Sequence, residues 1–212
     1  MKRKGLPKAS SNRPSAEVRF DISDSALKRW DSTIKAATSD EANTINIFGV
    51  IGEDFWTGDG WTAKRVSGLL RYIGSDQDVV VNINSPGGDM FEGLAIYNLL
   101  REHRGKVTTQ VLGVAASAAS VIAVGGDEVK IARAGFFMIH NTWALIAGNR
   151  HQLRDFADTL EPFDKAMADI YSARTGSDIK EMSELMDDET WIGGSDAVEK
   201  GFADSLVASD EI

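Results

Sequence analysis

Three short stretches of the sequence bring together residue types that could carry out covalent chemistry on a carbonyl group. They are Asn84-Ser-Pro-Gly-Gly-Asp89, Ala115-Ala-Ser-Ala-Ala-Ser120 and Met138-Ile-His-Asn141. A serine hydroxyl is a poor nucleophile until a base removes its proton, so Ser117 needs a partner such as His140. The two adjacent glycines permit positive φ and can turn backbone N–H groups towards a developing oxyanion. Together the three stretches predict a nucleophilic serine, a histidine base and an oxyanion hole.

Each stretch taken alone also has a plainer interpretation. Ser117 could simply cap a tightly packed alanine helix, and it does not stand in the Gly-x-Ser-x-Gly pattern of α/β-hydrolases. His140 could be a structural residue at the end of the apolar run Phe136–Ile139, and the Pro-Gly-Gly turn could do no more than join a strand to a helix. A phosphate-binding loop is a weaker interpretation of that turn, because no Lys-Ser/Thr pair follows it. The other two histidines, His103 and His151, lie in charged or polar stretches and are expected to be exposed to solvent.

The elements that must position these residues follow from the hydrophobic pattern. Strands are predicted over residues 18–22, 44–51, 78–84, 106–112, 128–132 and 136–139, and helices over 62–73, 89–100, 116–124, 149–174 and 177–188, with a last short helix from Ser195. The alternation of strands and helices from residue 44 to residue 132 predicts parallel strands joined by right-handed crossovers. Sites in open α/β folds lie at the carboxyl ends of such strands. The predicted fold class is therefore α/β, with a helical C-terminal portion.

Composition limits the class of protein. The 212 residues suffice for one substantial domain, which we place at residues 16–212, after a disordered basic arm at residues 1–15. Without any cysteine, disulfides and thiol catalysis are excluded, and we expect neither a metal nor another cofactor. The net charge of −9 argues against nucleic acid as the main ligand, because phosphate binding needs a positive face. No apolar run is long enough to span a membrane, so we expect a cytoplasmic protein.

The three stretches, taken in this order, resemble the proteolytic subunit of the Clp protease, peptidase family S14. The similarity rests on Ile83-Asn-Ser-Pro-Gly-Gly88, Gly113-Val-Ala-Ala-Ser117 and Met138-Ile-His140, and it extends over about residues 44–207. A Clp-like branch from tailed phages and prophages, known as head maturation proteases, is more similar still. Its features appear at Ile51-Gly-Glu53, in residues 88–98, at His140-Asn141 with Trp143, at Ala173-Arg-Thr-Gly176 and in Leu185-Met-Asp-Asp-Glu-Thr-Trp191.

The resemblance implies a spiral of β-α-β units like that of the crotonases, and it assigns roles to individual residues. Ser117 would be the nucleophile and His140 the general base. The backbone N–H groups of Gly88 and Ala118 would form the oxyanion hole.

The third member of the triad is where the sequence departs from the family. Leu185 stands where the Clp subunit has its aspartate, although an acid is still needed to hold the imidazole tautomer. We predict Asp187 for this role, with Asp188 and Glu189 as alternatives, because the helix ends here and the chain can turn back. The same residues could instead form a capping or solvent-facing acidic cluster. A Ser-Lys dyad is less favoured, because Lys106 and Lys130 lie on predicted strands without a motif around them.

These observations lead us to expect a serine endopeptidase that acts on polypeptides. The phage resemblance predicts that it processes capsid or scaffold protein during head maturation, and it implies a homo-oligomeric ring built around the helix at residues 149–174. One alternative is a degradative Clp-type subunit that works with a separate AAA+ unfoldase, because the sequence contains no Walker motif of its own. A crotonase-like acyl-CoA enzyme is another, and so is a catalytically idle assembly protein, which the missing aspartate at position 185 would favour.

Overall fold

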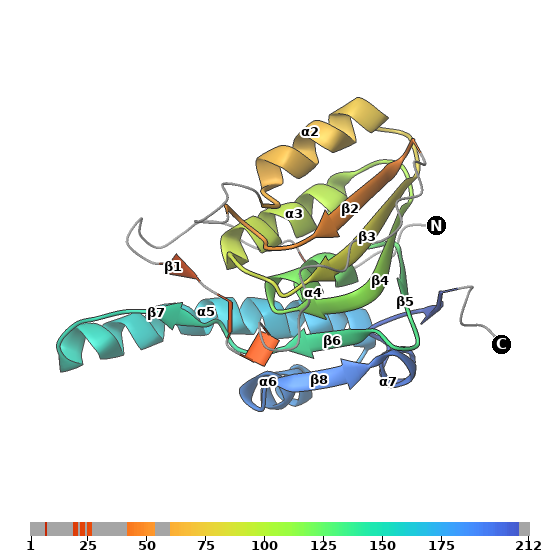
Figure 1. Cartoon of the computed structure of the whole chain (residues 1–212). Helices are drawn as coiled ribbons and strands as arrows, with labels where there is room; N and C mark the ends of the chain where they lie inside the picture. The colour runs from red at the N-terminus through yellow and green to blue at the C-terminus, as the bar shows by residue number, and fades with distance from the viewer. Residues whose placement is uncertain are drawn as a thin grey trace.

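The computed structural model describes residues 7, 19–20, 22–23, 25–26, 42–53 and 60–207. Of the arm predicted over residues 1–15 only Pro7 is described, so the prediction of disorder lies outside the described residues. Strand β1 (Arg19–Phe20) confirms part of the strand predicted over residues 18–22. It pairs antiparallel with β7 (Ala144–Leu145), which leads into the longest helix of the described chain (Figure 1).

The centre of the fold is a sheet of parallel strands, as the alternating pattern predicted. Along its main path the strands are β2 (Thr44–Phe48), β3 (Val79–Ser85), β4 (Val107–Ala116), β5 (Glu128–Ile131) and β9 (Ser205–Leu206). Each neighbouring pair on this path is parallel. The apolar, β-branched runs form these strands because a buried sheet favours such side chains. Four of their side chains are almost completely buried: Ile45, Ile47, Val81 and Ile83.

Strand β4 divides the sheet into two branches. Its first half pairs with β5, whereas its last three residues pair with β6 (Phe136–Ile139). Strand β6 in turn pairs antiparallel with β8 (Thr190–Gly193). The sequence predicted that this strand would end at residue 112 and that a helix would begin at Ala116, but β4 continues to Ala116 because its end is paired with β6. The carboxyl ends of β4 and β6 therefore lie side by side.

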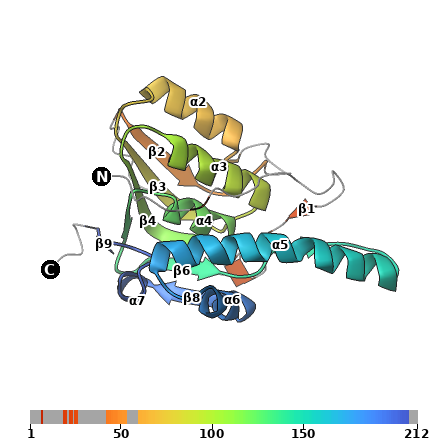
Figure 2. The ribbon, with the colours of Figure 1, turned by 180° about the vertical axis from the view of Figure 1, so that it is seen from behind.

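Helices cover one side of the sheet (Figure 2). They are α2 (Ala63–Ile73), α3 (Met90–Glu102) and α4 (Ala118–Val124), and α5 (Arg150–Thr175) crosses below them on the same side. Polar caps fix where three of them begin, since Thr62, Asp89 and Asn149 each accept backbone N–H groups from the first turn that follows. Gly176 ends α5 in the left-handed conformation, at the stop that the sequence predicted.

The C-terminal portion is helical apart from two short strands. Helices α6 (Ile179–Asp187) and α7 (Gly194–Glu199) flank β8 (Figure 1). The second half of α5 packs into the core through residues such as Met167 and Tyr171, whereas its first half extends beyond the sheet. No helix in the described part of the chain is both long and apolar enough to cross a membrane. The architecture is the mixed α/β fold with a parallel sheet that the sequence predicted.

Candidate active site

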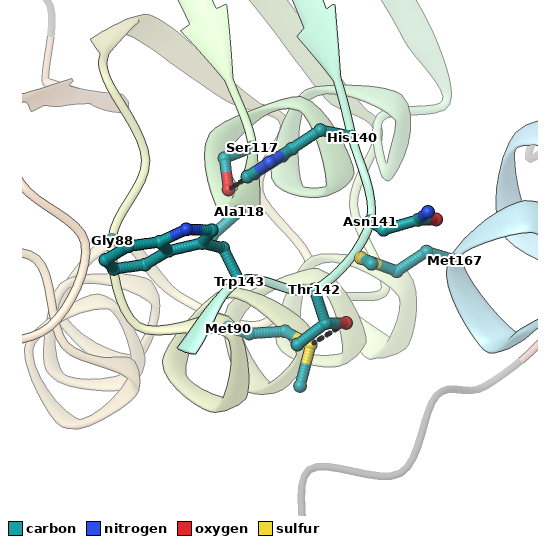
Figure 3. Close-up of a pocket in the computed structure, with 9 residues that line it drawn as sticks. All are labelled: Gly88, Met90, Ser117, Ala118, His140, Asn141, Thr142, Trp143 and Met167. Carbon is teal, nitrogen blue, oxygen red and sulfur yellow. Dashed lines mark hydrogen bonds between the residues drawn. The ribbon is translucent and has the colours of Figure 1, made fainter. Parts of the chain in front are cut away.

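Ser117 and His140 directly follow β4 and β6, the two strands whose ends lie side by side. The Ser117 Oγ is 2.7 Å from Nε2 of His140, which is a hydrogen-bond distance (Figure 3). The Ser117 N–H also donates to the Met138 carbonyl over 2.9 Å, so the strand pairing continues up to the serine. When Nδ1 carries the ring proton, Nε2 accepts the serine hydroxyl. This geometry is suited to removing the proton from Ser117.

The backbone of Ser117 is strained. Its φ of 54° and ψ of −125° lie in a region that side-chain-bearing residues rarely adopt. Such a conformation costs roughly 1–3 kcal/mol and persists only where the surrounding structure holds it. Gly87 provides the necessary room, because a Cβ there would lie 2.6 Å from the Ala116 carbonyl oxygen and 2.7 Å from the Ser117 Cβ. The turn between β4 and α4 therefore depends on Gly87, the first glycine of the predicted Pro-Gly-Gly turn.

His140 is buried, with an exposed fraction of only 9%. Burial lowers the pKa of its imidazole, and the negative charge of Glu189 opposes that shift. The lowered pKa means that the ring stays neutral to a lower pH than an exposed histidine would. Because only the neutral ring can accept a proton, this environment keeps His140 available as a base.

The three acidic residues considered for the third position lie in different places. Asp187, our first choice, ends α6, and its Oδ1 accepts a hydrogen bond from Asn141 Nδ2 over 2.6 Å. Within the described part of the chain, Asp187 has no hydrogen bond to His140. Asp188 is the exposed C-cap of α6. The role of Asp187 as a direct partner of the imidazole thus stays a prediction.

Glu189 directly precedes β8, the strand that pairs with β6. The antiparallel pairing of β6 with β8 matches Ile139 with Thr190, so its continuation sets His140 opposite Glu189. Glu189 has a positive φ of 48°, which marks a sharp turn between α6 and β8. It is the carboxylate whose charge acts on the pKa of the imidazole.

Asp164 also supports this segment, and it was not predicted from the sequence. Its Oδ1 accepts the Thr142 backbone N–H over 2.6 Å, and burial raises the pKa of the carboxyl. Asp164 lies on α5 among several other acidic residues, and no local signal distinguishes it from them. The two residues that follow His140 are therefore each held by a carboxylate, Asn141 by Asp187 and Thr142 by Asp164.

The two N–H groups expected to form an oxyanion hole border the same pocket as Ser117. The turn that carries Gly88 is fixed by Ile51, whose N–H donates to the Gly87 carbonyl and whose carbonyl accepts the Asp89 N–H, each over 2.8 Å. A Cβ at Gly88 would overlap the Ile51 carbonyl, so the close approach requires glycine. The N–H groups of Gly88 and Ala118 have no acceptor within the described part of the chain. Both are therefore available to a ligand.

The rest of the pocket wall combines apolar side chains with a few polar groups (Figure 3). Met90, Trp143 and Met167 supply the apolar surface, and the Thr142 hydroxyl donates to the Met90 Sδ over 3.3 Å. Among the described residues, no group of histidine and acidic side chains is arranged to hold a metal ion. Such a wall is suited to an apolar group bound next to the serine.

The two other histidines lie away from this pocket. The prediction that His103 is exposed was wrong, because the ring is buried and its Nε2 lies 2.7 Å from the Gln77 carbonyl oxygen. That contact closes the end of α3 against the loop before β3. His151 is exposed at the start of α5, as predicted.

The chain is similar in sequence to known proteins over most of its length. Residues 60–210 match the family model of the Clp protease. The ATP-dependent Clp protease proteolytic subunit 3 of Rhodococcus jostii is 30% identical over 156 residues, covering 71% of this chain and 77% of the relative. Subunit 1 of Streptomyces coelicolor is 28% identical over 151 residues, which is 69% of each chain. The proteolytic subunit of Chlorella vulgaris is 28% identical over 153 residues, or 70% of this chain and 76% of its own. The chain therefore belongs to the Clp protease family.

Proposed function

We propose that the chain is a serine endopeptidase in which Ser117 attacks the scissile carbonyl. His140 takes the hydroxyl proton and later gives it to the leaving amine, which leaves the acyl group on Ser117. Water then attacks this acyl group, with His140 taking the proton of the water and returning it to the Ser117 oxygen as the acid product leaves. The N–H groups of Gly88 and Ala118 stabilise the oxyanion. The observation that carries the proposal is the 2.7 Å contact between Ser117 Oγ and His140 Nε2 at the ends of two adjoining strands.

We further propose that two carboxylates share the work of the third triad member. Glu189 supplies the negative charge that favours the protonated imidazole as it forms. Asp187 acts through its hydrogen bond to Asn141 and thereby fixes the chain next to the histidine. Asp188 is exposed as a helix cap, and no contact connects it to the imidazole within the described chain.

The biological substrate in this proposal is a capsid or scaffold protein that is trimmed during phage head maturation. Its support is the similarity of residues 88–98 and 185–191 to the phage branch. We retain the interpretation that residues 16–212 form one peptidase domain, that it acts in the cytoplasm, and that α5 contributes to a homo-oligomeric ring. A solvent-exposed first half of α5, with Leu153 42% exposed, is compatible with contact between subunits.

A degradative Clp-type subunit is the second candidate. The observation that favours it is that the relatives described above are named as ATP-dependent proteolytic subunits. Such a chain would depend on a separate AAA+ unfoldase, because its own sequence has no Walker motif.

One experiment separates the two candidates. The purified chain is incubated with an assembled scaffold or capsid protein and, in parallel, with a stable folded protein that carries a degradation tag. Each reaction is run with and without ATP and a Clp-type unfoldase. ATP-independent cleavage of the scaffold or capsid protein at a few sites supports head maturation. Processive digestion of the tagged protein that requires both ATP and the unfoldase supports the degradative subunit.

A further inference from the structure

Two buried hydroxyl groups outside the pocket are linked to the backbone of Ser117. The Ser120 Oγ donates a hydrogen bond to the Ser117 carbonyl oxygen over 2.6 Å, and it lies 2.7 Å from the Tyr171 hydroxyl. Both side chains are almost inaccessible, with exposed fractions of 0% for Ser120 and 1% for Tyr171. Neither residue lines the pocket. The contacts link α5, which carries Tyr171, to the backbone of the proposed nucleophile.

The chemistry of the groups fixes the direction of this chain of hydrogen bonds. A carbonyl oxygen can only accept, so the single hydroxyl hydrogen of Ser120 is directed to Ser117. The hydrogen in the contact between Ser120 and Tyr171 must then come from the phenol. Burial raises the pKa of Tyr171, so the phenol retains its proton. The order of donation is Tyr171 to Ser120 to the Ser117 carbonyl.

The acceptor of this chain belongs to the same peptide unit as the proposed oxyanion donor. A trans peptide is planar, so the carbonyl of Ser117 and the N–H of Ala118 point in opposite directions. The Ser120 N–H also donates to the Ser117 carbonyl, over 2.9 Å, so two donors hold that oxygen in place. Holding the carbonyl therefore sets the direction of the Ala118 N–H. Hydrogen bonds in series also polarise one another, so those accepted by the Ser117 carbonyl make the Ala118 N–H of the same peptide a stronger donor.

We propose that Ser120 and Tyr171 are positioning residues that hold the peptide between Ser117 and Ala118 so that the Ala118 N–H points at the oxyanion. The same contacts help to keep Ser117 in its strained conformation, with φ at 54°. The inference rests on the proposed peptidase function of Ser117. Neither residue touches the substrate; both act through the backbone of the nucleophile.

Tyr171→Phe is the sharpest variant, because it removes one oxygen and keeps the ring that packs 5.9 Å from Phe202. Ser120→Ala removes the link itself, and the double variant joins the two changes. Tyr97→Phe is a matched control: Tyr97 is also a buried tyrosine, its hydroxyl donates to the Pro7 carbonyl over 2.7 Å, and burial raises its pKa to about 12. It has no contact with Ser117.

The full-length chain and these variants are treated with a fluorophosphonate, and the rate of adduct formation on Ser117 is followed by intact mass. The steady-state constants for a peptide substrate are measured in parallel. We expect labelling and kcat to fall about 10-fold in Tyr171→Phe and about 100-fold in Ser120→Ala, with KM within about twofold of wild type. The double variant is expected to match Ser120→Ala, because the phenol acts only through Ser120. The pH midpoint of the reaction is expected to stay unchanged, because neither residue contacts His140.

The outcomes are separable. The positioning role would be overturned if wild type is labelled and Tyr171→Phe reacts at the wild-type rate, or is slowed no more than Tyr97→Phe. That result would leave the peptidase proposal intact. The positioning role would also be overturned if, in both single variants, the loss of labelling rate and kcat matches the loss of folded protein measured by circular dichroism. An unlabelled wild type would instead refute the proposed function and the inference that rests on it.

Discussion

The Asp187 carboxylate accepts a hydrogen bond from the side chain of Asn141 over 2.6 Å, one residue beyond His140. The next residue, Thr142, is held in the same way by Asp164. Helices α6 and α5 thus each contribute a carboxylate to the segment that leaves β6. The proposed base is positioned by the chain that follows it as well as by the strand before it.

Replacing Glu189 by glutamine should lower the apparent pKa of the catalytic base. The charge of Glu189 raises the pKa of His140, so its removal should move the acidic limb of the kcat/KM profile to lower pH. We expect kcat at the plateau to fall about 10-fold, because a charge that favours the imidazolium is lost. The measurement is a pH profile of peptide hydrolysis for both proteins.

Asp187→Asn is the companion variant, because the amide oxygen can still accept a hydrogen bond from Asn141. We expect its pH profile to overlay that of wild type, with a small loss of kcat. If Asp187 is instead the direct third member, as the sequence predicts, Asp187→Ala should lose about 10⁴-fold in kcat. A loss of that size together with an unchanged Glu189→Gln profile would reverse the two roles.

The elements that could be predicted from the sequence are those determined by residues close together in the chain. The strands over residues 44–48 and 79–85 follow from β-branched apolar runs, and Thr62, Asp89 and Asn149 begin helices because their side chains satisfy free N–H groups. The pairing of Ser117 with His140 was predictable because both follow apolar strands of one parallel sheet. A resemblance over three ordered motifs made that inference specific.

Features set by contacts between distant segments could not be predicted in this way. The strand Thr190–Gly193 was missed because only four residues form it, and its partner β6 lies about fifty residues earlier in the chain. That pairing determines which acidic residue faces His140, so the order of preference between Asp187 and Glu189 could not be fixed from the sequence. The burial of His103 was missed for the same reason, since its partner Gln77 comes from another loop.

Asp164→Asn should stabilise the protein at neutral pH. Burial raises the pKa of Asp164 in the folded state, so the folded chain binds more protons than the unfolded chain between the ordinary carboxyl pKa near 4 and the raised value. Stability contributed by the protonated form is therefore lost as pH rises through that window. Asparagine remains uncharged and can still accept the Thr142 N–H.

Thermal melts at several pH values test this prediction. We expect the variant to melt about 1–3 °C above wild type at pH 7, and the difference to shrink as pH falls towards 4. A variant that melts lower than wild type at pH 7 would show that the negative charge of Asp164 stabilises the fold.

Gly87→Ala should lower the stability of the protein and the reactivity of Ser117 by more than the strain of a positive φ alone would cause. Gly87 has a φ of 92°, and an added Cβ would meet the Ala116 carbonyl and the Ser117 Cβ at less than 3 Å. Gly176→Ala is a matched control, because its φ of 81° is similar but no atom lies within 4 Å of the added Cβ. We expect Gly176→Ala to cost about 1 kcal/mol of unfolding free energy and to keep its activity.

Gly87→Ala is expected to cost at least about 2 kcal/mol and to lose most of its reactivity at Ser117. Urea unfolding gives the free energies, and labelling of Ser117 gives the reactivity. Equal costs in the two variants would mean that the turn can move away from Ser117, in which case its close packing is not required.

The central claim is that Ser117 is activated by His140. The most direct test is intact mass after fluorophosphonate treatment of wild type, Ser117→Ala and His140→Ala, carried out on each oligomeric fraction. We predict one adduct on wild type, none on Ser117→Ala, and labelling of His140→Ala slowed by at least about 10³-fold, because in the described part of the chain the hydroxyl has no hydrogen bond to another base. Wild type without an adduct in every fraction, or an adduct that persists in Ser117→Ala, would contradict the account.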